Sequence, residues 1–320
     1  MTFRRAMVSF LALTWGSLLA SGSLATYAPA AEFLPAAALQ SPAENGSAKA
    51  PAETEIHERA AKLIQNQHTN DAALEQYERV EHYVERTTGP NSRVILDKTY
   101  RIVPNGGGTT KILLSDHGMP IDPKDYRREL ELLRGILEMM AHPDDSRAKA
   151  AYEKYQKRQR ERADFVDVAR SAFVVKWEGR ETCDGRACEV FVLNPDPNFH
   201  PHSMYQDAMA HVTGKIYVDR ETNELIRGQM DVTSDIYFGG GILGRLSRGS
   251  QVSMDQAEVA PGIWLPTRYQ YDFSGRKFLF SFTQHQTIEA SHYRRIGPPA
   301  EALAAIQKEL ATGKPAAGDP

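Results

Sequence analysis

The 320-residue chain has only two cysteines, little net charge and no long apolar run. A formal charge of −3, from 38 Lys plus Arg against 41 Asp plus Glu, creates no field that would attract nucleic acid. No apolar run reaches the roughly 18 to 20 residues of a membrane-spanning helix, so we expect no transmembrane anchor in the mature chain. The remaining composition, 41% hydrophobic and 25% charged, excludes collagen-like, coiled-coil and wholly disordered proteins.

The sequence also lacks the short motifs of common enzyme classes. It contains no G-x-x-x-x-G-K-[ST], no H-E-x-x-H and no G-x-S-x-G. Gly239, Gly241 and Gly244 match G-x-G-x-x-G, but no helix opening follows and no strand-helix-strand unit surrounds them. These glycines therefore predict a bend between two strands. We expect a protein that is not an enzyme and needs no cofactor.

Histidines gather in one predicted loop, where His200, His202 and His211 accompany Asp196 and Asp207. Three imidazoles and a carboxylate are a possible shell for zinc or copper, which would make the chain a metal-dependent enzyme. Loops also collect polar residues for solubility, and no second-shell pattern supports the three histidines. We therefore predict no metal site, and elemental analysis of the purified protein would decide the alternative.

The first thirty residues have the order of a secretory signal peptide. Arg4 and Arg5 precede a mostly apolar run over 6–20, which is followed by small residues up to residue 30. No cysteine lies near the cleavage region to carry a lipid. The sequence therefore predicts a signal peptide over 1–30 and a periplasmic or secreted protein.

Two segments have compositions that do not support a packed core. Residues 31–52 are rich in Ala and Pro, which predicts a disordered linker. Residues 298–320 begin with a possible short helix, from Ala300 to Leu310, and end in Gly, Pro and Ala, which predicts a flexible C-terminal tail.

Cys183 and Cys188 are separated by Asp184, Gly185, Arg186 and Ala187. A two-residue turn at Gly185 and Arg186 would place the two cysteines directly opposite each other in a hairpin, at a spacing that suits a disulfide. In an oxidising compartment we expect them to form a disulfide. The alternative is two free thiols.

Helical periodicity occupies the first half of the mature chain. A helix begins at Glu53, and the cap pair Asp122-Pro123 opens a second one with a wide apolar stripe that includes Leu133 and Leu137. A third helix follows and carries seven basic residues between Arg147 and Arg162. That basic face is either solvated or a docking surface for anionic lipid or an acidic partner.

From about residue 171, strand-like segments separated by turn residues predict an antiparallel meander. One face of its last two strands is apolar and aromatic, with Ile263, Leu265, Tyr269, Tyr271 and Phe273 in one strand and Phe278, Phe280 and Phe282 in the next.

Two short motifs carry a resemblance to a known family. The segment 215–227, with Val218-Asp219 followed by Thr222, Leu225 and Arg227, resembles a hairpin of LolA-like proteins, which include outer-membrane lipoprotein carriers and RseB-type stress sensors. Gly262-Ile263-Trp264-Leu265-Pro266 is similar to a later strand start of the same superfamily. The resemblance covers residues 53–297, with 122–163 as a helical insertion.

The resemblance implies an α+β fold, a strongly curved antiparallel sheet or half-barrel whose concave face is covered by helices. It also implies that residues 74–88 form the first strand, although their spacing fits a helix as well. Such a fold would bind a lipid, an acyl chain or a lipoprotein in an apolar cavity. The cavity face would comprise Ile263, Leu265, Tyr269, Tyr271, Phe273, Phe278, Phe280, Phe282, Leu133 and Leu137. The alternative is an envelope stress sensor or scaffold that binds another protein.

Overall fold

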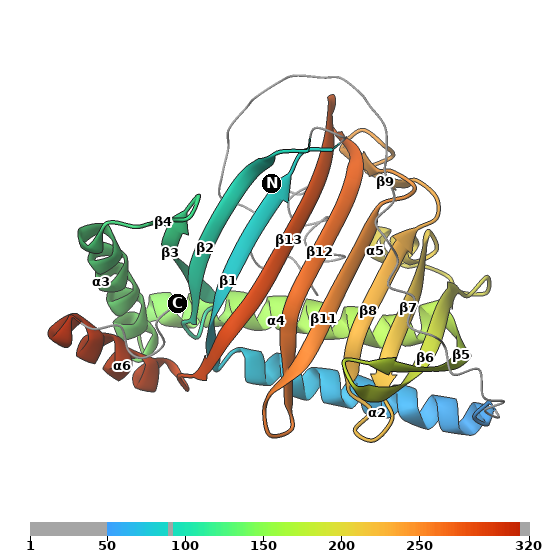
Figure 1. The fold of residues 1–320 in the computed structure, drawn as a ribbon, viewed down its shortest axis with the longest axis horizontal. Helices are drawn as coiled ribbons and strands as arrows, with labels where there is room; N and C mark the ends of the chain where they lie inside the picture. The colour runs from blue at the N-terminus through green and yellow to red at the C-terminus, as the bar shows by residue number, and fades with distance from the viewer. Residues whose placement is uncertain (1–49, 89–91, 314–320) are drawn as a thin grey trace.

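The computed structural model describes residues 50–88 and 92–313, apart from the side chains of 161–166, 170, 204 and 205 (Figure 1). Its helices are α2 (Glu53–Leu74), α3 (Pro123–Met140), α4 (Ser146–Ala172), α5 (Met204–Met209) and α6 (Pro299–Thr312). The predicted signal peptide, and the predicted linker up to residue 49, lie outside the described residues. Within 50–88 and 92–313, no helix is both long enough and apolar enough to cross a bilayer.

The strands form one open antiparallel sheet. In chain order they are β1 (Tyr77–Arg86), β2 (Val94–Pro104), β3 (Thr109–Asp116), β4 (Met119–Pro120), β5 (Phe173–Cys183), β6 (Arg186–Pro195), β7 (Val212–Asp219), β8 (Leu225–Val232), β9 (Ile236–Phe238), β10 (Gly244–Leu246), β11 (Gln251–Ala260), β12 (Ile263–Lys277) and β13 (Phe280–Arg295). The order across the sheet is β4-β3-β2-β1-β13-β12-β11-β8-β7-β6-β5. The first strand of the sheet, β1, pairs with the last one, β13, inside the sheet and not at its edge.

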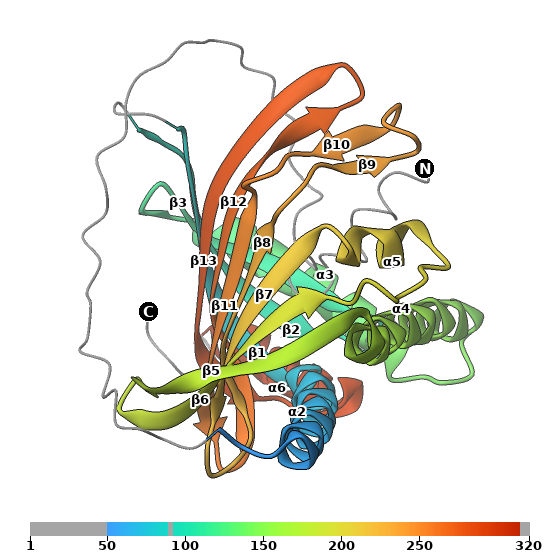
Figure 2. The same ribbon diagram turned by 90° about the vertical axis from the view of Figure 1, so that its right-hand side faces the viewer.

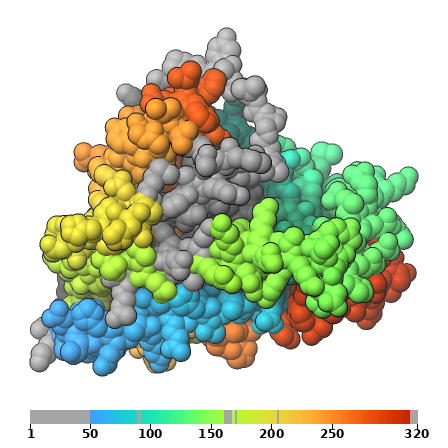
Figure 3. All heavy atoms as spheres, turned by 180° about the vertical axis from the view of Figure 1, so that it is seen from behind, coloured from blue at the N-terminus to red at the C-terminus, as the bar shows by residue number. Residues whose placement is uncertain are grey.

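The sheet is bent, and an edge view shows α2, α4, α5 and the β9–β10 hairpin on its concave side (Figure 2). From behind, α2 and α4 run along the lower part of that side (Figure 3). The predicted fold class is confirmed: the protein is α+β, with a curved antiparallel sheet whose concave face carries helices.

Helix α2 is fixed to the sheet by asparagine side chains. Asn66 donates to the carbonyl oxygens of Thr222 and Asn223, at 3.0 and 3.1 Å. Asn70 donates to the Glu224 carboxylate at 2.8 Å and accepts from the backbone N–H of Trp264 at 3.0 Å. The apolar spacing of this helix predicts an end near residues 66–70. The hydrogen bonds of Asn66 and Asn70 to the sheet hold the following turn in place, so α2 continues to Leu74.

Residues 77–86 form strand β1, as the family resemblance implied and helical spacing did not. Both of its neighbours, β2 and β13, supply antiparallel backbone hydrogen bonds along its length. Tertiary pairing on two sides thus outweighs a local spacing that fits either structure.

The glycine segment over 239–241 forms the bend of the β9–β10 hairpin, as predicted. Gly239, Gly240 and Gly241 all have positive φ angles, between 57° and 85°, which a residue with a side chain rarely adopts. The hairpin lies against the end of β12, where the backbone N–H of Phe278 donates to the carbonyl of Leu243 at 3.1 Å.

Helices α3 and α6 pack together at the other end of the sheet and form an aliphatic core with β2 and β3. We call this core the end cluster; its buried residues are Val103, Ile112, Leu130, Leu133, Leu137, Ile296, Ala302 and Ile306. Val103 lies three positions from Tyr100 on β2 and so points to the opposite face of that strand. The end cluster is therefore separate from the concave face.

The C-terminal region differs from the predicted flexible tail. Over 299–312 it forms helix α6, whose Ala302 and Ile306 are buried in the end cluster. An apolar stripe with i, i+4 spacing within an alanine-rich segment explains the difference, because composition alone does not report where a helix packs.

Candidate functional site

Apolar side chains from strands across the whole sheet meet on its concave face. We call this group the concave cluster; its buried residues are Tyr83, Ala172, Phe173, Ala208, Met209, Val212, Val232, Ile236, Phe238, Leu246, Tyr271, Phe273 and Ile288. The cluster includes residues from the end of α4 and from α5, the helices on that side. It is a continuous aromatic and aliphatic surface, since antiparallel strands place alternate residues on one face.

Strand β12 contributes the aromatic centre of this surface. Tyr271 and Phe273 are 0% and 2% exposed, and Tyr269 packs beside them. The rings of Tyr269 and Tyr271 are stacked with centroids 6.3 Å apart, and those of Tyr271 and Phe273 are tilted at 5.6 Å. Such offset ring pairs contribute beyond their buried area, so the row is well fixed.

The structure brings together only part of the predicted cavity face. Tyr269, Tyr271, Phe273 and Phe282 lie in or against the concave cluster, whereas Leu133 and Leu137 lie in the end cluster. Ile263 and Leu265 lie at the start of β12, near the end that contacts α2.

Phe278 and Phe280 lie at the tip of the β12–β13 hairpin instead of on its inner face. They are 47% and 74% exposed. Phe278 has a φ angle of 52°, so the chain reverses there and the period of two that predicted a continuous phenylalanine row is interrupted.

A polar group lies on the same face at the β1 end of the concave cluster. We call it the polar cluster: Arg79, Glu81, Tyr83 and Lys111. Arg79 Nε donates to Glu81 Oε1 at 2.7 Å, the Tyr83 hydroxyl donates to Glu81 Oε2, and Lys111 Nζ donates to the Tyr83 oxygen at 2.7 Å. The residues alternate along β1, which places their side chains on the concave side with Tyr83.

The polar cluster is buried, and its electrostatics show the effect. Burial lowers the pKa of Lys111 to about 8, although Glu81 acts against that shift. Burial also opposes protonation of Arg79, but Glu81 together with Tyr293 and Tyr269 outweighs that effect, so the Arg79 pKa is raised. The Lys111 ammonium lies 4.3 Å from the centre of the Tyr83 ring and 5.5 Å from that of Tyr100. These aromatic faces stabilise the cation in a site with little water.

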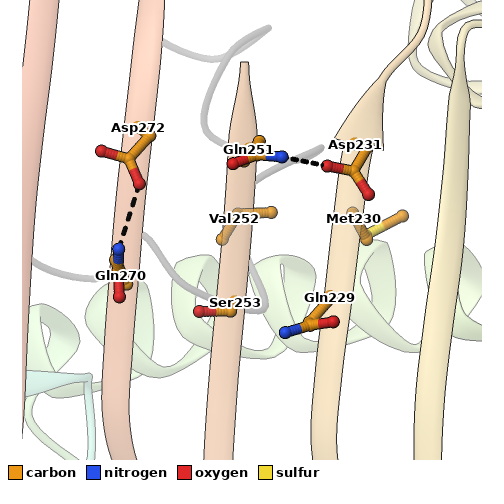
Figure 4. A pocket seen from close by; sticks show the side chains of 8 residues that line it. All are labelled: Gln229, Met230, Asp231, Gln251, Val252, Ser253, Gln270 and Asp272. Atoms are coloured by element: carbon orange, nitrogen blue, oxygen red, sulfur yellow. Dashed lines mark hydrogen bonds between the residues drawn. The ribbon is translucent and has the colours of Figure 1, made fainter. Parts of the chain in front are cut away.

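Residues on the convex face are polar in the same stretch of sheet. A pocket of about 240 Å³ opens there (Figure 4), lined by Gln229, Met230, Asp231, Gln251, Val252, Ser253, Gln270 and Asp272. Gln251 donates to Asp231 at 2.5 Å and Gln270 to Asp272 at 3.1 Å. Gln251 and Asp231 thus pair across neighbouring strands, and Gln270 and Asp272 pair along β12, which is the pattern of a solvated sheet face.

Solved structures resemble this arrangement, while no protein-family model and no curated protein matches the sequence. A LolA superfamily protein from Nitrosomonas europaea aligns with a TM-score of 0.31 at 10% identity, covering 76% of this chain and 96% of that one. A DUF1329 family protein from Desulfovibrio piger aligns with a TM-score of 0.29 at 11% identity, covering 75% of this chain and 92% of that one. A chain of the MucA/MucB complex of Pseudomonas aeruginosa aligns with a TM-score of 0.21 at 7% identity, covering 74% of this chain and 93% of that one.

The chain has an open, curved antiparallel sheet with helices on the concave side, which is the architecture that the resemblance of 215–227 and 262–266 implied. The function proposed below rests on the residues of this chain.

The first of those LolA-like motifs has a structural role here. Asp219 Oδ1 accepts hydrogen bonds from the backbone N–H groups of Glu221 and Thr222, both at 2.9 Å, and from the Thr222 hydroxyl at 3.1 Å. The turn that results presents the carbonyls of Thr222 and Asn223 to α2. The motif thus positions a helix on the concave side.

The cysteines differ from the sequence prediction. The hairpin turns at Asp184 and Gly185, both with positive φ, so Cys183 pairs with Arg186 and Cys188 pairs with Glu181. This turn replaces the predicted one because two consecutive residues that tolerate positive φ form a type I′ turn. Cys183 and Cys188 are buried free thiols on the same face, diagonal to each other, and the structure contains no disulfide between them.

The histidine group does not converge in the described structure. His211 Nδ1 lies 2.7 Å from the Ser234 hydroxyl, and Asp207 is at 4.0 Å from its other ring nitrogen. Among residues 50–88 and 92–313, no group of three or more His, Cys, Asp or Glu side chains is arranged to hold a metal ion.

The sequence reasoning missed the polar cluster. Arg79, Glu81 and Tyr83 occupy alternate positions in a segment whose type was ambiguous, and Lys111 lies in another strand. Once residues 77–86 are known to be a strand, alternation alone places the two charged residues on the same face as Tyr83.

Proposed function

We propose that this protein binds a lipid or acyl chain along the concave cluster of its LolA-like sheet. The observation that supports the proposal is the contrast between the two faces of β12 and its neighbours. Tyr269, Tyr271 and Phe273 form an apolar row on one face, while Gln270 and Asp272 between them belong to the polar convex pocket.

Burial of hydrocarbon is a sufficient driving force for such binding. Each Å² of apolar surface removed from water contributes about 25 cal/mol, so an acyl chain laid along aromatic and aliphatic side chains binds without any catalytic group.

The cellular setting follows from the predicted signal peptide. We propose that the chain is exported and works in the cell envelope, where it would bind free lipid or the acyl chains of a lipoprotein. Cleavage near residue 30 in material recovered from the periplasm or medium would support export. Intact residues 1–30 in cytoplasmic material would contradict it.

The main experiment compares neighbouring residues on opposite faces. Met230 packs against the concave cluster and also borders the convex pocket, whereas Gln229 lines that pocket and is not part of the cluster. We expect Met230→Glu to weaken binding of hexadecanoate by about tenfold or more, because a carboxylate in the apolar lining must lose its hydration. Gln229→Glu should bind like the parent protein.

Binding would be followed by displacement of a fluorescent fatty acid and by native mass spectrometry of the mildly purified protein. Thermal unfolding would establish that both variants are folded. Equal binding by the two variants, or no binding by the folded parent protein, would contradict the proposal.

Binding of a protein partner by the basic face of α4 is the second function to separate from lipid binding. Lys154, Lys157 and Arg160 are exposed there, whereas Arg158 donates to the carbonyl of Gly107 at 2.7 Å. Changing these three exposed basic residues to Glu should leave hexadecanoate binding intact. Loss of binding would place the ligand on α4.

A further inference from the structure

The polar cluster contains a hydrogen-bond donor that the protein leaves unused. Arg79 is 12% exposed in its side chain, and its Nε is bonded to Glu81. Its Nη1 is buried and has no hydrogen-bond partner in the part of the chain that the structure describes. A buried guanidinium N–H without an acceptor is costly, so this position favours an acceptor supplied by a ligand.

A second cation lies close to that donor. Glu81 is the carboxylate that favours the charged forms of both Arg79 and Lys111. Because a guanidinium N–H binds a charged oxygen more strongly than a neutral one, the acceptor that best fits Arg79 Nη1 is a carboxylate or a phosphate.

The same group is continuous with the apolar surface. Tyr83 belongs to the concave cluster, Tyr100 packs against it, and their rings meet edge to face with centroids 5.4 Å apart. Tyr269 lies close enough to Arg79 to raise its pKa, and its ring stacks on Tyr271, the centre of the aromatic row. A molecule bound at Arg79 would therefore have its remaining part against β12.

We infer that the polar cluster binds the anionic head of an amphiphile whose tail lies along the concave cluster, with Arg79 Nη1 and Lys111 as the recognising groups. This rests on the proposed function and specifies its ligand class: a carboxylate or phosphate group attached to an acyl chain. Glu81 and Tyr83 are positioning residues, because they hold Arg79 Nε and Lys111 Nζ in place by hydrogen bonds.

The test separates the head from the tail by using ligands that share one and differ in the other. Hexadecanoate, palmitoyl lysophosphatidate and hexadecanol have sixteen-carbon chains with a carboxylate, a phosphate and a neutral head. The folded parent protein should bind both anions about tenfold or more tightly than the alcohol, because a charged acceptor meets the unused donor. Preference for the carboxylate would identify a free fatty acid, and preference for the phosphate a phospholipid.

Two variants locate the effect. Arg79→Met should remove most of the preference for the anions and leave hexadecanol binding within about twofold, while Arg79→Lys should keep part of the preference because it keeps the charge. Arg86→Met is the matched control: it changes an exposed arginine on the same strand, and binding of all three ligands should stay unchanged.

The outcomes distinguish this inference from the function on which it rests. If the parent protein binds all three ligands equally, or if Arg79→Met keeps the full preference, the head site is overturned while lipid binding stands. If none of the three binds, the proposed function fails as well. Should Arg79→Met not fold, the comparison of ligands on the parent protein and Arg79→Lys still decides.

Discussion

The end cluster and the concave cluster are built from different side chains and are covered in different ways. The end cluster is aliphatic and lies between α3, α6 and the β2–β3 strands. The concave cluster is aromatic, spreads over most of the sheet and receives residues from the end of α4 and from short helix α5. A small closed aliphatic core fixes the fold, whereas the broad aromatic and aliphatic face is the place where we propose that a ligand binds.

Their polar neighbours differ as well. Beside the end cluster, Arg101 donates to Glu78 and Glu309 with N–O distances of 2.8 Å, and Tyr126 donates to Glu309 at 2.8 Å. Arg294 also pairs with Glu78. In this network two arginines pair with two carboxylates, whereas Arg79 Nη1 in the polar cluster has no acceptor among the residues that the structure describes. The first network stabilises the fold, and the second carries the head site that we infer.

The largest effect should come from breaking the network around Arg101. We expect Arg101→Met to lower the free energy of unfolding by about 3–5 kcal/mol, because Glu309 loses its cationic partner while it stays buried. Urea unfolding measures the change. Arg127→Met, which removes an exposed pair with Glu131, should cost less than about 1 kcal/mol. Equal losses would mean that Glu309 is hydrated in the folded protein.

A second test concerns Leu133, which the family resemblance placed on the cavity face and which the structure places in the end cluster. Leu133→Ala should lower the free energy of unfolding by about 2–5 kcal/mol and leave the affinity of the folded fraction for hexadecanoate unchanged. Leu132→Ala, at a side chain that is 58% exposed, is the control with little effect. Weaker binding of hexadecanoate by folded Leu133→Ala would mean that α3 contributes to the ligand site.

Residue patterns predicted the sheet and its aromatic face well but predicted the contacts between elements poorly. Alternation placed Tyr271 and Phe273 on one face because the period of a strand is fixed by its geometry. The face that α3 covers depends on where the chain passes after β4, which no local period encodes. The cysteine register failed for a related reason: a shift of the turn by one residue changes every pair in the hairpin.

The polar cluster shows the same limit within the candidate site. Arg79 and Glu81 are two residues apart, but Lys111 meets Tyr83 only because β2 lies between β1 and β3. A charged residue in an alternating strand predicts a solvated face unless its partners are known. A buried charged residue can therefore be predicted only once the pairing of the strands is known.

The pH dependence of binding sharpens the contrast between the two networks. Lys111 faces Arg79, Glu81 and the rings of Tyr83 and Tyr100, and burial lowers its pKa to about 8. As the pH rises through 8 the ammonium loses its proton, so affinity for hexadecanoate should fall by about tenfold between pH 7 and pH 9, in proportion to the protonated fraction.

Hexadecanol, which has no charge, should bind equally at both pH values. Lys111→Met should bind hexadecanoate more weakly at pH 7 and lose most of the pH dependence. A parent protein whose affinity for hexadecanoate is constant from pH 7 to pH 9 would exclude Lys111 from the head site, while Arg79 would remain to be judged by its own variants.

The smallest effect should come from the convex pocket, which is the alternative place for a ligand on the sheet. Gln270 is exposed there and donates to Asp272. Gln270→Ala should change the free energy of unfolding by less than about 0.5 kcal/mol, because water replaces its hydrogen bond, and should leave hexadecanoate binding unchanged. A strong loss of binding would move the site to the convex face. The pocket's paired amides and carboxylates argue against that result, because a hydrocarbon chain bound there would leave them desolvated without compensation.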